Sequence, residues 1–116
     1  MPFQWAIEAE GGDAADKLRR VGRLTATEEP HLIDIAVRAW ARHDETVAAR
    51  LRRVDNTRMD FLRVMFATFV ADPDDVEARS TLMFSLAIGR HFIVADHPGR
   101  STRDVVQLAA EHLLRR

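Results

Sequence analysis

The fold of this chain is decided by residues 45–71, which read ETVAARLRRVDNTRMDFLRVMFATFVA. Apolar side chains recur there at intervals of three and four, which is the period of one face of a helix and not of a strand. A helix over the whole stretch would be about 40 Å long, so it would be the central helix of a small domain. The apolar positions that set the period are Val47, Leu51, Val54, Phe61, Leu62, Met65 and Phe69.

Helix caps and helix breakers divide the rest of the chain. Asp44, Asp72 and Ser101 each precede an apolar repeat and are typical N-cap residues, and Pro73 suits a first helical position. The apolar residues between these points again recur at three and four, so the chain is predicted to be all-α. We expect six helices, approximately over residues 2–10, 13–24, 28–43, 45–71, 73–95 and 101–113.

Length and composition exclude several classes of protein. The 116 residues fit one domain, spanning 1–116, and the 47% apolar content is that of a globular protein. The absence of cysteine excludes disulfides and thiolate metal sites, and a net charge of −1 is unlike that of a dedicated nucleic-acid binder. The sequence has no apolar run of about 18 residues, so no membrane-spanning helix is expected. Its N-terminus does not resemble a signal peptide. A cytoplasmic location is therefore expected.

Motifs of catalysis and metal binding are also missing from the sequence. It contains no GxSxG, GxxxxGK[ST], HExxH or GxGxxG pattern, and none of its five histidines pairs with another at i, i+4 spacing. We therefore expect no enzyme activity, no catalytic residue, no metal and no cofactor. His91 lies within an apolar run, which leaves it either as a core histidine or as a polar group in a cavity or dimer interface.

A second set of residues has both a structural and a functional interpretation. Arg58 falls within the apolar stripe and needs a partner, because an unpaired buried charge is costly. That partner is Asp55 or an acid or carbonyl of another helix, or else an anionic ligand. Large apolar side chains on three consecutive predicted helices either fill the core or line a cavity between helices. They are Trp40, Phe61, Met65, Phe69, Met83 and Phe84.

The stretch Ala39-Trp40-Ala41-Arg42-His43-Asp44, with Val47 and residues 54–62, resembles the effector-binding domain of the TetR family of bacterial repressors. The resemblance extends from about residue 3 to residue 114. It implies an all-α ligand-binding domain that dimerises through its last two helices as a four-helix bundle. The nearly all-round apolar character of residues 81–95 independently favours a partner copy. The expected interface residues are Leu86, Gly89, Ile93, Val106, Ala109 and Leu113.

These points predict the ligand-sensing and dimerisation domain of a TetR-like regulator, which binds a small, mostly apolar effector. The effector would contact the six large apolar residues, with Arg58 or His91 as a polar anchor. The helix-turn-helix head of the family is not found in this sequence, so this chain alone is not expected to bind operator DNA. It is either a fragment or a naturally headless relative. The alternative function is a helical homodimeric interaction module without a small-molecule ligand.

Overall fold

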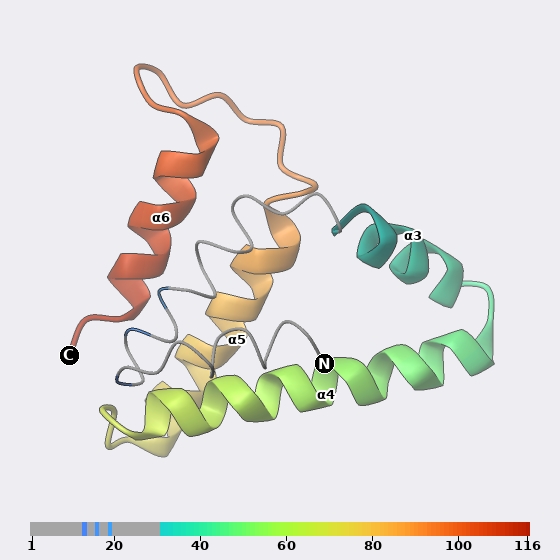
Figure 1. Cartoon of the computed structure of the whole chain (residues 1–116), viewed down its shortest axis with the longest axis horizontal. Coiled ribbons are helices and arrows are strands. Elements are labelled where there is room, and N and C mark those ends of the chain that lie inside the picture. The colour runs from blue at the N-terminus through green and yellow to red at the C-terminus, as the bar shows by residue number, and fades with distance from the viewer. Residues whose placement is uncertain (1–12, 14–15, 17–18, 20–30) are drawn as a thin grey trace.

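The computed structural model describes residues 13, 16, 19 and 31–116, and within them the chain forms α-helices and no strands (Figure 1). The helices are α3 (His31–Ala41), α4 (Glu45–Ala67), α5 (Pro73–Gly89) and α6 (Thr102–Leu113). The predicted all-α class is therefore confirmed. The helices predicted over 2–10 and 13–24 lie outside the described residues, apart from Asp13, Asp16 and Arg19. None of the described helices is long and apolar enough to cross a bilayer.

All three predicted N-caps of the described helices are confirmed. The side chains of Asp44, Asp72 and Ser101 accept hydrogen bonds from first-turn backbone N–H groups at 2.9 to 3.2 Å. These N–H groups have no partner inside the helix, so each cap satisfies a donor that would otherwise be left open. Pro73 occupies the first position of α5, where its missing N–H costs nothing.

Helix α4 is shorter than predicted, because it ends at Ala67 and not near residue 71. The Thr68 hydroxyl donates to the Met65 carbonyl at 2.7 Å and closes the last turn. Two residues further on, the Val70 side chain is buried, although it is not on the helix. The apolar repeat of residues 69 and 70 therefore comes from a turn that packs into the core.

The prediction that the fifth helix continues to residue 95 is wrong. Helix α5 ends at Gly89, and the backbone N–H groups of Phe92 and Ile93 both donate to the Gly89 carbonyl, at 2.9 and 3.1 Å. Residues 93–97 then have no regular structure, and the chain turns at Gly99, whose φ is +74°. Glycine at a helix end and β-branched residues after it both favour leaving the helix. A continuous apolar run has no period that distinguishes the two outcomes.

The apolar core lies where α4, α5 and α6 meet. Helix α5 returns from the C-terminal end of α4, α6 runs antiparallel to α5, and α3 folds back over the N-terminal part of α4 (Figure 1). Phe66 at the centre is fully buried. The buried residues of this core are Phe61, Leu62, Phe66, Val70, Met83, Ala110 and Leu114.

Arg79 of α5 hydrogen-bonds to the C-terminal end of α6. Its guanidinium donates to the backbone carbonyls of Leu113, at 3.1 Å, and of Arg115. The last carbonyls of a helix lack partners within the helix, so these bonds cap α6 from outside. Arg79 also pairs with Asp75 at 3.0 Å, one turn earlier on the same face of α5.

Candidate functional site

Most of the large apolar residues predicted to line a ligand site lie together. Phe61 and Met83 are buried in the core, and Met65, Phe69 and Phe84 are partly buried against it. Trp40 is different, because its side chain is 59% exposed at the C-terminal end of α3. The structure thus gathers the predicted residues of α4 and α5 and leaves Trp40 at the surface. Contact of all six with a ligand stays a prediction.

Four charged side chains join α3 to α4. Arg38 donates from Nη1 and Nη2 to the two carboxylate oxygens of Asp55, both at 2.8 Å. Its Nε lies 3.3 Å from Asp34 Oδ1, and Arg58 Nη1 donates to Asp34 Oδ2 at 3.2 Å. We call Asp34, Arg38, Asp55 and Arg58 the α3–α4 charge network. It contains two charges of each sign, so it neutralises itself.

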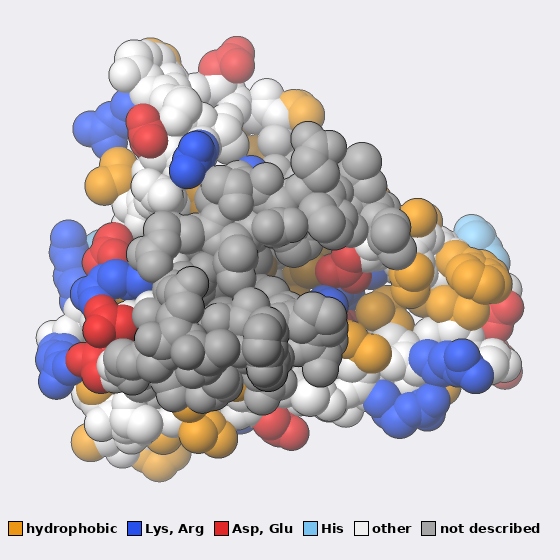
Figure 2. Space-filling model, in the orientation of Figure 1, with side chains coloured by type: hydrophobic (Ala, Val, Ile, Leu, Met, Phe, Trp, Pro, Cys, Tyr) orange, Lys and Arg blue, Asp and Glu red, His pale blue; other side chains and the backbone are white. Residues whose placement is uncertain are grey.

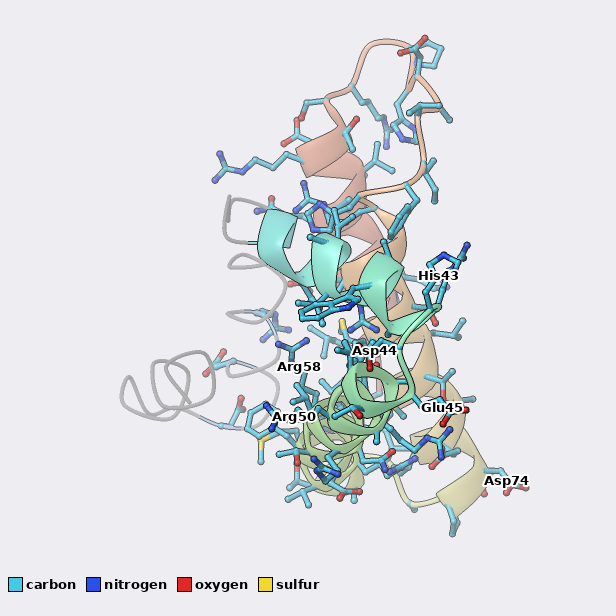
Figure 3. All side chains as sticks on the ribbon, turned by 90° about the vertical axis from the view of Figure 1, so that its right-hand side faces the viewer. His43, Asp44, Glu45, Arg50, Arg58 and Asp74 are labelled. Atoms are coloured by element: carbon cyan, nitrogen blue, oxygen red, sulfur yellow. The ribbon has the colours of Figure 1, made fainter. Side chains whose placement is uncertain are left out.

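The spacing within each helix brings these four side chains to the same interface. Asp34 and Arg38 are four residues apart on α3, and Asp55 and Arg58 are three apart on α4, so each pair shares one helix face. Figure 3 shows Arg58 on the side of α4 that faces α3. Because both acid–base pairs point at the contact between the helices, the network links the helices as well as the residues of one turn.

Arg38 connects three helices. The hydrogen bonds with Asp55 raise the pKa of Arg38 above its ordinary value, against the opposing effect of burial, so the guanidinium stays charged. The same guanidinium carbon lies 5.8 Å from the centroid of the Phe84 ring on α5, within the range of a cation–π contact. Arg38 therefore holds α3 against both α4 and α5.

Arg58 has the partner that its position requires, though not the nearest one in sequence. Asp55 lies three residues before it, but Arg38 occupies both oxygens of that carboxylate. Arg58 instead binds Asp34 of α3. This confirms the prediction that its partner is either Asp55 or an acid of another helix. Nη1–Asp34 is its one polar contact in the described part of the chain, and its side chain is 31% exposed. Several of its guanidinium donors therefore have no partner among the described residues.

His91, the second predicted anchor, lies beyond the end of α5. Its backbone N–H donates to the Ile88 carbonyl at 3.2 Å in the turn that follows the helix. The side chain is partly buried, as the sequence predicts for a histidine in an apolar run, but it does not lie on a helix face. A role for His91 in ligand binding stays a prediction.

The residues predicted to form a dimer interface have different surroundings. Val106 is buried within its own chain, and Leu86 and Leu113 pack against the core while remaining partly exposed. Ala109 and Gly89 are also partly exposed, and a Cβ atom added at Gly89 would meet nothing within 4 Å. Close packing inside the chain therefore gives no reason for a glycine at that position. Val106 has little surface left for a partner.

Exposed apolar side chains concentrate after α5. Phe92, Ile93 and Val94 are 58%, 64% and 94% exposed, and we call them the apolar segment 92–94. Leu82 on α5 and Leu108 on α6 are also more than half exposed. Ile93, one of the predicted interface residues, is thus mostly exposed, although it lies in a loop and not in a helix.

A second ion-pair cluster lies on the outer surfaces of α4 and α5. Arg63 donates to both carboxylate oxygens of Glu77, at 2.8 and 2.9 Å, and to Asp60 at 2.9 Å. The i, i+3 spacing of Asp60 and Arg63 puts both on one face of α4. Hydrogen bonding to Arg63 lowers the pKa of the Glu77 carboxyl. These side chains are more exposed than those of the α3–α4 charge network. Figure 2 shows that basic and acidic side chains also lie next to one another elsewhere on the described surface.

Sequence reasoning missed three members of the α3–α4 charge network as a candidate site. Asp34 and Arg38 were not selected at all, and Asp55 was considered only as a partner for Arg58. The signal that was present is the i, i+4 spacing of an acid and an arginine on one face of α3. Within the described residues, no group of three or more histidine and carboxylate side chains is arranged to hold a metal ion. The chain matches no protein-family model, no curated protein and no solved structure.

Proposed function

We propose that this chain is the effector-sensing and dimerisation half of a TetR-like bacterial transcription regulator. In this proposal six helices form one domain of residues 1–116, and α5 and α6 pack against their symmetry mates. DNA binding would belong to a separate helix-turn-helix head. The order of the described helices, with a long α4 that carries core residues and two later helices beside it, supports the proposal.

The observation that carries the proposal is the exposed apolar surface on the last two helices and their connection. Soluble monomers rarely leave large contiguous apolar patches in water, and such patches are typical of interaction sites. The apolar segment 92–94, together with Leu82 and Leu108, leaves five large apolar side chains more than half exposed. A two-fold axis would let one surface cover the same surface of a second copy.

The effector is proposed to bind between α3, α4 and α5. Phe84 of α5 lies against Arg38 of α3, Met65 of α4 is only partly buried, and Met side chains adapt readily to ligands of different shape. Binding would favour one disposition of the two protomers over another, so the response is a shift in populations and not a chemical reaction. The proposed location of the sensing step is the cytoplasm, where a DNA-binding regulator would meet its effector.

Dimerisation is tested by a matched pair of substitutions. Ile93→Glu places a charge in the apolar segment 92–94, and Val64→Glu places the same charge at an equally exposed site on α4. Neither change disturbs the core, since both side chains are mostly exposed. We expect Ile93→Glu to give monomers in size-exclusion chromatography with light scattering, and Val64→Glu to leave the dimer intact. Equal effects of the two changes would refute this interface.

Effector binding separates the proposal from the alternative of a dimeric interaction module without a ligand. Both share the interface, but only a sensor gains stability from a small apolar molecule, because ligands that bind the folded state raise its melting temperature. The measurement is a melting-temperature screen with apolar compounds, together with Trp40 fluorescence in a Trp5→Phe background. A screen in which no compound changes either signal would favour the interaction module.

A further inference from the structure

We infer that Arg58 binds the carboxylate of an amphipathic monocarboxylic acid whose apolar chain lies along α4. This inference rests on the proposed function, because it names the chemical class of the effector. The effector would carry a negative charge and would displace the Asp34 carboxylate from Arg58.

The two guanidinium groups of the α3–α4 charge network make unequal numbers of contacts. Arg38 makes two bonds of 2.8 Å with Asp55 and a third charged contact with Asp34. Arg58 makes one bond, to Asp34, at 3.2 Å, which is longer than the 2.7 to 2.9 Å typical of an N–H donor with a carboxylate. Arg58 is therefore the cation of the network that can take another anion.

The shape of the free donors selects a carboxylate. A guanidinium presents its N–H groups as a planar fork that matches the two oxygens of a carboxylate. In Arg58 only Nη1 has a partner in the described part of the chain, so Nε and Nη2 remain for such a fork. The side chain is 31% exposed, so part of it is open to solvent.

The network tolerates the loss of the Asp34–Arg58 bond. Asp34 lies 3.3 Å from Arg38 Nε through its other oxygen, so it keeps a cation when an incoming carboxylate takes Arg58. The displacement thus exchanges one carboxylate for another at Arg58 and leaves no buried charge unpaired. It also weakens one of the contacts that hold α3 on α4, which couples ligand binding to the position of α3.

The surroundings of Arg58 on α4 favour an apolar chain behind the carboxylate. Phe61 and Leu62 lie three and four residues further along, on the same side of the helix, and both belong to the core. Met65 follows one turn later and is only partly buried. Phe61 and Leu62 are buried, so the accessible apolar side chains within two helical turns of Arg58 include the partly buried Met65 and, one turn before Arg58, Val54, which is 46% exposed.

The experiment compares sodium octanoate with octan-1-ol, which has the same chain and no charge, by titration calorimetry on the full chain. We expect octanoate to bind at least about tenfold more tightly than octan-1-ol. Arg58→Gln should weaken octanoate binding about 10- to 100-fold and leave octan-1-ol unchanged, since it removes charge-assisted hydrogen bonds. Arg58→Lys keeps the charge without the fork, so it should fall between the two.

Arg53→Gln is the matched control, because it removes the same charge from an exposed position of α4. It should change the affinity for neither compound. Equal affinity of the unmodified chain for octanoate and octan-1-ol, or an unchanged octanoate affinity in Arg58→Gln, would overturn the inference while leaving an apolar effector in place. Binding of neither compound would count against both the inference and the proposed sensing function.

Discussion

Two ion pairs of nearly the same geometry, one between α3 and α4 and the other between α4 and α5, should differ in how much they stabilise the fold. Arg38 and Asp55 form a two-pronged pair with both bonds at 2.8 Å, and Arg63 and Glu77 form one with bonds of 2.8 and 2.9 Å. They differ in exposure: 20% and 28% for the first pair, against 38% and 55% for the second. The perturbation is a double-mutant cycle on each pair, with Arg→Met and with Asp→Asn or Glu→Gln.

Burial sets the expected magnitudes. A hydrogen bond to a charged group is worth about 1.5–3 kcal/mol when shielded from water, and exposed pairs are worth much less because solvent and salt screen them. The Arg38–Asp55 pair is mostly but not fully shielded, so we expect a coupling free energy of about 1–2 kcal/mol. The coupling of Arg63 with Glu77 should be clearly smaller, and salt should weaken it more strongly.

The assay is urea denaturation of the unmodified chain, the four single variants and the two double variants, at low and high salt. The cycle removes effects that each single substitution has on its own, so only the interaction between the two side chains remains. Equal coupling for the two pairs, or a coupling near zero for Arg38 with Asp55, would refute the view that the α3–α4 charge network holds α3 in place.

Three further predictions concern single positions. The Ser80 hydroxyl is fully buried and has no hydrogen-bond partner in the described part of the chain. In urea denaturation, Ser80→Ala should therefore leave the free energy of unfolding unchanged or raise it by up to about 1 kcal/mol. A clear loss of stability would contradict this. Gly99 has φ +74°, so Gly99→Ala should cost about 1 kcal/mol, whereas Gly89→Ala meets open space at an ordinary φ and should not lower the stability of the protomer. Hydrogen bonding to Arg63 lowers the pKa of Glu77 below its ordinary 4.5, so the pair stabilises the fold above about pH 4.5 and loses this effect as the pH falls through the lowered pKa. The urea midpoints of the unmodified chain and of Glu77→Gln should therefore differ at pH 7 and become equal in acid. A difference that does not depend on pH would contradict this prediction.

Local signals in the sequence predicted the described helices well where a cap or a breaker is present. Asp44, Asp72 and Ser101 act on backbone groups within three residues, so each helix start depends only on nearby sequence. The end of α5 has no capping side chain of this kind. Residues 82–95 are apolar on nearly every side of a helix, so their pattern does not show where the helix stops. Gly89, at which α5 ends, is a weaker local signal, and it is predicted from the sequence to lie in the dimer interface instead.

The candidate site was predictable in kind but not in its pairing. The position of Arg58 in an apolar stripe required an anionic partner, and the structure supplies one. Which carboxylate binds Arg58 depends on how α3 crosses α4, and that crossing brings Arg38 onto Asp55 first. Val106 shows the same limit, because an apolar residue on α6 satisfies a core position and an interface position equally well until the packing of its own chain is known.

The mass of the unmodified chain in solution tests the central claim most directly. The exposed apolar segment 92–94, with Leu82 and Leu108, is proposed to be covered by a second copy. Sedimentation equilibrium over a range of low micromolar concentrations should therefore give twice the 13.2 kDa of one chain. A single species of 13.2 kDa at every concentration would contradict the proposed dimer and, with it, the assignment of this chain as the dimerising half of a regulator.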